Sequence, residues 1–122
     1  MEREKIKSFT DLIAWKESHV LVLMIYTATE KFPKEEIFGL TNQIRRAAVS
    51  ITSNIAEGFS RVGVDDKKKF YAIALGSLTE VQNQILIGRD LHYIPSNEFS
   101  KIAQQTVTVS KLINGLRKIK HT

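Results

Sequence analysis

The stretch that most constrains this chain is residues 39–61, GLTNQIRRAAVSITSNIAEGFSR. Apolar side chains recur in it every three or four residues, which is the spacing of one face of an α-helix. These side chains are Leu40, Ile44, Ala47, Ile51 and Ile55. We therefore expect a long amphipathic helix that buries this face against the rest of the chain.

A row of polar side chains follows the same helical spacing beside the apolar face. The row consists of Gln43, Arg46, Ser50, Ser53 or Asn54, and Glu57. Amides and hydroxyls alternate in it with one arginine and one glutamate, whereas a solvated helix face normally carries mostly charged side chains. This composition predicts that the row is partly buried and that its polar groups have partners.

The same helix resembles the signature of a known family. QIRRAAVSITSNIAEGFSR is similar to the signature of the small bacterial four helix bundle proteins, also called intervening-sequence proteins after members encoded within 23S ribosomal RNA genes. FTDLIAWKESHVLVLMIYTATEKFPKEEIFGL and FYAIALGSLTEVQNQILIGRDLHYI match in order and spacing, so the resemblance covers residues 9–94 well and the last helix loosely. It implies an antiparallel bundle that assembles into a ring, a pentamer, and it implies no activity.

The first helix is expected to follow Thr10, whose hydroxyl can cap it, and to end at Phe32-Pro33, because proline disfavours helix at the preceding residue. Side chains at helical spacing define its buried stripe. They are Leu12, Trp15, His19, Val22, Tyr26 and Thr29. His19 is therefore expected to be a hydrogen-bonded residue of the core.

The third helix, residues 66–91, is the most apolar, and Asp65 or Asp66 is expected to cap it. Gly76 and Gly88 are expected to let neighbouring helices approach closely. Several apolar side chains lie outside its main stripe, namely Tyr71, Leu75, Leu78, Leu86, Ile73 and Ile87. Because a bundle helix needs an apolar stripe only about 100° wide, we expect another subunit to bury this excess.

Pro95 and Ser96 mark the start of a fourth helix, with Ser96 as its expected cap. Its apolar spacing continues through Phe99, Ile102, Thr106, Val109, Ile113 and Leu116. Four helices joined by short links predict an all-α, antiparallel, up-down-up-down four-helix bundle. At 122 residues the whole chain, residues 1–122, is expected to form one domain.

The composition argues against several classes of function. The chain has no cysteine, which excludes disulfides and thiolate chemistry and fits a reducing cytoplasm. None of His19, His92 and His121 has a glutamate three residues before it, as di-iron bundles require. Ser50 and Ser53 lack a nearby histidine base.

No apolar run approaches the roughly 18 residues of a membrane span, and the charged N-terminus does not resemble a signal peptide. We expect a cytoplasmic protein that is not an enzyme, with no cofactor, metal or membrane contact.

Glu57 and Glu80 are the two carboxylates that could in principle work together in acid–base chemistry. In a helical hairpin centred near Val62 or Gly63, however, Glu80 lies opposite Arg46, because their numbers are symmetric about that turn. We therefore expect a buried ion pair between Arg46 and Glu80.

Two hypotheses from different classes remain. The first is a non-catalytic oligomeric interaction module that presents a shared surface to a protein partner. The second is an RNA-binding or other nucleic-acid-binding protein, supported by a net charge of +5 and by Arg45, Arg46, Arg61 and Lys67–Lys69. The basic residues are not interleaved with exposed aromatics, and consecutive lysines cannot all face one groove, so any such binding is expected to be weak. The candidate interaction surface consists of Gln43, Arg45, Arg46, Ser50, Asn54, Glu57, Arg61 and Glu80.

Overall fold

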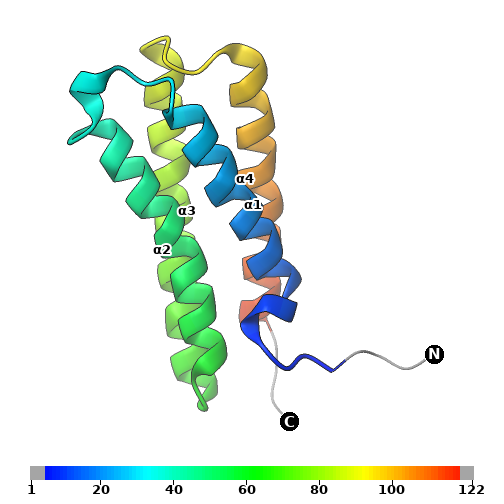
Figure 1. Ribbon diagram of the computed structural model, residues 1–122. Coiled ribbons are helices and arrows are strands. Elements are labelled where there is room, and N and C mark those ends of the chain that lie inside the picture. Colours follow the sequence, from blue (N-terminus) through cyan, green and yellow to red (C-terminus); the bar gives the residue numbers. More distant parts are fainter. Residues whose placement is uncertain (1–4, 119–122) are drawn as a thin grey trace.

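The computed structural model describes residues 5–118, which form four long helices and, within that range, no strand. The helices are α1 (Ile13–Thr29), α2 (Leu40–Ser60), α3 (Val64–Asp90) and α4 (Ser96–Arg117), with short 3-10 helices η1 (Phe9–Asp11) and η2 (Lys34–Glu36). Figure 1 shows consecutive helices running in opposite directions along one bundle axis. The predicted all-α, up-down-up-down bundle is therefore confirmed.

The apolar face predicted for residues 39–61 forms part of the core. Leu40, Ile44, Ala47, Ile51 and Ile55 are all buried. They belong to one apolar cluster to which all four helices contribute. Each helix packs against two neighbours, since α2 and α4 both contact α1 and α3. The 3.6-residue period was thus sufficient to orient α2.

The helix caps differ from the prediction at three places. Thr10 does not cap the first long helix: α1 follows Leu12, where no side chain caps it, and Ser8 instead caps η1, its hydroxyl accepting the backbone N–H of Thr10. The Asp11 carboxylate accepts the backbone N–H groups of Lys7 and Ser8, which lowers the pKa of Asp11. Gly63 and Pro95 stand at the cap positions of α3 and α4, where no side chain caps the helix. The predicted caps by Asp65 or Asp66 and by Ser96 are therefore wrong, and the two aspartates lie in the first turn of α3 instead.

His19 is exposed, so its predicted place in the core is wrong. Its ring stacks on Trp15, with centroids 4.8 Å apart and planes 12° apart. The core-facing side of α1 instead carries Ala14, Ser18 and Leu21. The first two of these side chains are small, and the broad apolar character of α1 hid this shift of its buried face.

The glycines predicted to allow close helix packing behave differently from one another. A Cβ at Gly88 would come within 2.8 Å of Ile94, as expected for a close approach, but a Cβ at Gly76 would meet nothing within 4 Å. The closest approach is at Gly58 near the end of α2, where a Cβ would lie 2.6 Å from the ring of Tyr71 on α3. Gly58 therefore allows the buried Tyr71 ring to pack directly on the α2 backbone.

Replacing Gly58 by alanine should lower the free energy of unfolding by about 1–3 kcal/mol, because the added methyl group overpacks the contact with Tyr71. Gly76→Ala is the matched control: it should raise stability by up to about 1 kcal/mol, because alanine favours the helix and the position is open. Urea denaturation at equal protein concentration compares the two variants. Equal stabilisation by both substitutions would contradict the close contact.

Candidate functional site

The polar row of α2 meets α3 through a pair of hydroxyl groups. The Oγ atoms of Ser50 and Ser77 lie 2.8 Å apart, within hydrogen-bond distance. Asn54 Nδ2 donates to the backbone oxygen of Ser50 at 2.8 Å and to its Oγ at 3.0 Å. Ser77 is buried, and Ser50 and Asn54 are half-buried. This part of the row is paired and partly buried, as predicted.

Arg46 and Glu80 do not form the predicted buried ion pair. Both side chains are exposed, and neither takes part in a salt bridge within residues 5–118. Small residues such as Ala47, Ser50 and Ser77 fill the space between α2 and α3, which leaves the two long side chains at the rim of the contact. There, water competes for both charges and an ion pair contributes little.

Arg46 and Glu80 nevertheless line the same hollow between α2 and α3, with a volume of about 510 Å³. Its other lining residues are Asn42, Gln43, Ala47, Ser50, Ser77 and Gln84. Gln84 is only 8% exposed, and its Oε1 is itself buried and has no hydrogen-bond partner among residues 5–118. Buried polar atoms without partners are rare. The hollow thus combines a cation and amides from α2 with a carboxylate from α3, which suits a polar partner.

Arg45 connects α2 to α1. Its Nε donates to Thr29 Oγ1 at 2.8 Å, and its guanidinium lies 4.7 Å from the centre of the Tyr26 ring. A second hollow of about 640 Å³ adjoins these residues, and Arg46 and Ser50 line both hollows. Arg45 is therefore held in place by α1, whereas Arg46 extends freely between the two hollows.

Glu57 and Arg61 interact with each other at the far end of α2. Glu57 Oε2 lies 3.1 Å from Arg61 NH2, and the Arg61 guanidinium lies 4.6 Å from the centre of the Phe70 ring. Glu57 does not line the hollow that Glu80 lines. The pair of carboxylates considered for acid–base chemistry is therefore not brought together.

The basic run Lys67–Lys69 is divided between different environments. Lys67 Nζ donates to the backbone oxygen of Phe59 at 2.7 Å and lies 5.4 Å from the centre of that ring. This lysine satisfies a carbonyl at the end of α2, where a positive charge is favourable. Lys68 and Lys69 are exposed. The run therefore does not form a single basic patch.

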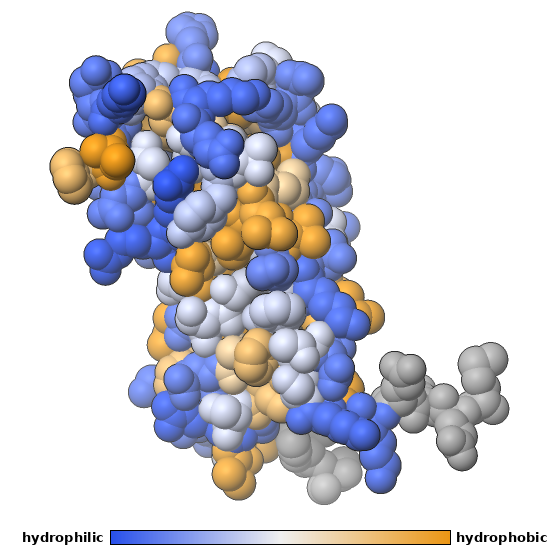
Figure 2. Space-filling model, in the orientation of Figure 1, coloured by the Kyte–Doolittle hydropathy of each residue, from blue (hydrophilic) through white to orange (hydrophobic). Residues whose placement is uncertain are grey.

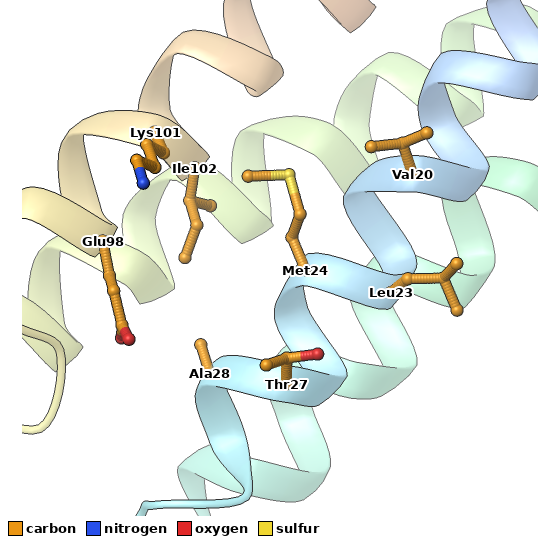
Figure 3. A pocket seen from close by; sticks show the side chains of 8 residues that line it. All are labelled: Val20, Leu23, Met24, Thr27, Ala28, Glu98, Lys101 and Ile102. Atoms are coloured by element: carbon orange, nitrogen blue, oxygen red, sulfur yellow. The ribbon is translucent and has the colours of Figure 1, made fainter.

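A groove between α1 and α4, with a volume of about 330 Å³, is lined mostly by apolar side chains. In Figure 2 an apolar patch lies over the middle of α1. Val20 and Leu23 of α1 are 42% and 55% exposed, and Met24 is half-buried. In Figure 3 Met24 and Ile102 extend toward one another across the groove, while Leu23 points away from α4. Glu98 and Lys101 of α4 also line the groove.

The apolar excess predicted on α3 is smaller than expected. Tyr71 and Leu78 are buried within the chain itself, and Leu75 is half-buried. Ile73, Leu86 and Ile87 do remain exposed. Exposed apolar side chains are therefore found on α3 as well as along the groove of α1 and α4.

Over residues 5–118, no helix has the length and apolar character to cross a membrane. In the same range, no three His, Asp or Glu side chains are grouped so that they could hold a metal ion. His121, one of the histidines considered in the sequence, lies outside the described residues.

Comparison with known proteins gives a family. A model of the family described as 23S rRNA-intervening sequence protein matches residues 10–115. The chain belongs to this family. The family match continues through most of α4, beyond the part of the chain in which the sequence resemblance is strong.

A solved structure supports the same fold. It is that of a protein with unknown function from the S23 ribosomal protein family of Bacteroides thetaiotaomicron, with a TM-score of 0.80 and 20% identity. The similarity covers 88% of this chain and 100% of that chain. A comparison with the curated proteins finds no match. Family membership therefore supports the bundle and leaves its biochemical role open.

Sequence reasoning missed the groove residues and Gln84. The run VLVLMIY, residues 20–26, contains a signal for the groove: it is wider than one helix face, so side chains on both sides of the buried Leu21 and Ile25 must face outward. Gln84 gave no such signal, because the sequence of an apolar helix does not show whether a buried amide has a hydrogen-bond partner.

The exposed positions of Arg46 and Glu80 predict a small energetic coupling. In a double-mutant cycle with Arg46→Ala and Glu80→Ala, the coupling free energy should be at most about 0.5 kcal/mol. Replacing the buried Ser77 by alanine should cost more, about 1 kcal/mol, because it removes the hydrogen bond between the hydroxyls of Ser77 and Ser50. Urea denaturation measures both. A coupling well above about 1 kcal/mol between Arg46 and Glu80 would mean that the pair forms in solution.

Proposed function

We propose that the protein is a non-catalytic subunit of a ring-shaped homo-oligomer, a pentamer, that acts as an interaction module in the cytoplasm. The observation that carries this proposal is the open apolar groove between α1 and α4 together with the exposed apolar residues of α3. Large contiguous apolar surfaces on small soluble proteins are typical of interaction sites. The pentameric ring is what the family resemblance implies, and the absence of cysteine fits the cytoplasm.

The polar face of α2 and α3 is the proposed surface for a partner of the ring. Gln43, Arg46 and Glu80 line its hollow. A polar surface with donors and acceptors in fixed positions favours specificity in recognition. We propose a protein partner for this face, because its charges of opposite sign lie side by side, whereas a phosphate backbone favours positive charge alone.

RNA remains the alternative partner, supported by specific residues rather than by net charge alone. Arg46, Lys68 and Lys69 are exposed and have no salt bridge within residues 5–118. Arg45, Arg61 and Lys67 are already held by contacts within the chain. Among the basic residues that the sequence suggested for RNA, those left free are few and lie on two different helices, so they support weak binding without sequence preference.

Self-assembly predicts that the chain sediments as an oligomer at micromolar concentration. Leu23→Glu should dissociate or precipitate the assembly, because it places a charge on the apolar surface of α1. Val107→Glu is the matched control, since Val107 is exposed on α4 but does not line the groove. Circular dichroism should show unchanged helix content in both variants. Sedimentation of the unmodified protein as a 13.9 kDa monomer would refute the proposal.

RNA binding is tested by gel shifts of structured RNA over a series of salt concentrations. We expect weak binding that falls steeply with salt, because contacts with phosphates release counterions. Replacing Lys68 and Lys69 by glutamine should reduce the salt slope by about one for each lysine that contacts a phosphate. Lys111→Gln on α4 is the control. Tight, salt-insensitive binding to one RNA sequence would contradict this expectation and favour the alternative function.

A further inference from the structure

Phe38 is an apolar side chain that lacks a partner within residues 5–118. It is 92% exposed at the end of the link between α1 and α2, next to Ile37, which is also exposed. A phenylalanine buries about 150–250 Å² when it is covered, so this exposure forgoes a large apolar contribution. The link therefore presents a protruding apolar group to its surroundings.

The link is held in a fixed position. The Glu36 carboxylate accepts the hydroxyl of Tyr93 at 3.0 Å and the backbone N–H of Leu40 at 3.2 Å. The hydrogen bond to Glu36 raises the pKa of Tyr93. These bonds join the link to α2 and to the turn before α4, so Phe38 is presented without a large entropic cost of ordering the link.

The groove between α1 and α4 has the size and chemistry to receive this group. An apolar cavity of about 150 Å³ is enough to hold benzene, and the groove offers about 330 Å³ between Met24, Ala28 and Ile102. It can therefore accept the ring of Phe38 together with part of Ile37. In the same chain the link projects away from α4, so its own groove stays open (Figure 1).

The charges beside the two features are complementary. Lys101 lines the groove and Glu35 lies in the link, both exposed and neither in a salt bridge within residues 5–118. Glu98, the other charged residue of the groove, already pairs with Lys31 at 3.0 Å. The link of a second copy would thus bring a carboxylate to Lys101, a groove cation that forms no salt bridge within residues 5–118.

The positions of link and groove determine the kind of assembly. Both lie toward the same end of the bundle, with the link beside α2 and the groove on the side of α1 and α4 (Figure 1). A contact between two different surfaces of identical chains is heterologous, and it closes into a ring when the rotation between copies allows. We propose that Phe38 of each copy is seated in the α1–α4 groove of the next copy and that this contact builds the ring. This inference rests on the self-assembly proposed above.

Phe38→Ser tests the contact, and Val62→Ser is its matched control. Val62 is 96% exposed at the turn between α2 and α3, at the other end of the bundle. Sedimentation should show assembly weakened by about tenfold or more for Phe38→Ser, as the loss of one buried aromatic side chain implies. Val62→Ser should assemble like the unmodified protein. Equal assembly of both variants would overturn the inference.

Because the chain has no cysteine, introduced thiols also report the contact directly. Ile37→Cys and Thr27→Cys are combined in one chain, which retains Phe38, and a short bismaleimide links the thiols. We expect a ladder of covalent oligomers that ends at the ring size, because each copy contributes one thiol to each neighbour. A mixture of the two single variants should give dimers only, and Val62→Cys with Thr27→Cys should give no ladder.

The outcomes separate this inference from self-assembly itself. An oligomer in which Ile37→Cys with Thr27→Cys gives no ladder would overturn the seating of Phe38 and leave the ring in place. A monomeric protein would overturn both.

Exchanging the two charges provides a further measurement. The single variants Glu35→Lys and Lys101→Glu should each weaken assembly, and the double variant should restore it. Failure of the double variant to recover would contradict the predicted placement of Glu35 beside Lys101.

Discussion

The close packing of α2 on α3 is the constraint on which the polar face of the molecule depends. Small side chains, among them Ala47, Ser50 and Ser77, occupy this contact, and Tyr71 packs where Gly58 has no side chain. Side chains as long as those of Arg46 and Glu80 cannot enter so narrow a contact without displacing the helices. They therefore stay at the rim, and the hollow between them is a consequence of the small residues beneath.

Sequence periodicity predicted the parts of the fold that depend on apolar burial. Leu40, Ile44 and Ile51 repeat at helical spacing among polar neighbours, so the pattern of α2 identifies one buried face. In α1 nearly every residue from Val20 to Tyr26 is apolar, so no single face stands out, and the position predicted for His19 was wrong. Periodicity orients a helix only when its polar face is as distinct as its apolar one.

The candidate site was harder to predict than the fold, because pairing between polar groups depends on distances that a sequence does not contain. The symmetry of a hairpin placed Arg46 opposite Glu80 correctly enough for both to line one hollow. That symmetry argument took no account of side-chain length, and the long side chains of Arg46 and Glu80 stay apart at the rim. Likewise, Glu57 and Arg61 are four residues apart, a spacing that permits a local bridge, and that bridge forms while Glu57 stays away from Glu80.

The structure also separates residues that maintain the bundle from residues that remain available. Arg45 is bound to Thr29 and lies over Tyr26, Asn54 is bound to Ser50, and Arg61 is bound to Glu57. A partner that recruited these side chains would first have to break contacts that they already make. Gln43, Arg46 and Glu80 carry no such cost, because they line a hollow and make no salt bridge or side-chain hydrogen bond within residues 5–118. Recognition at this face therefore costs least at these three residues.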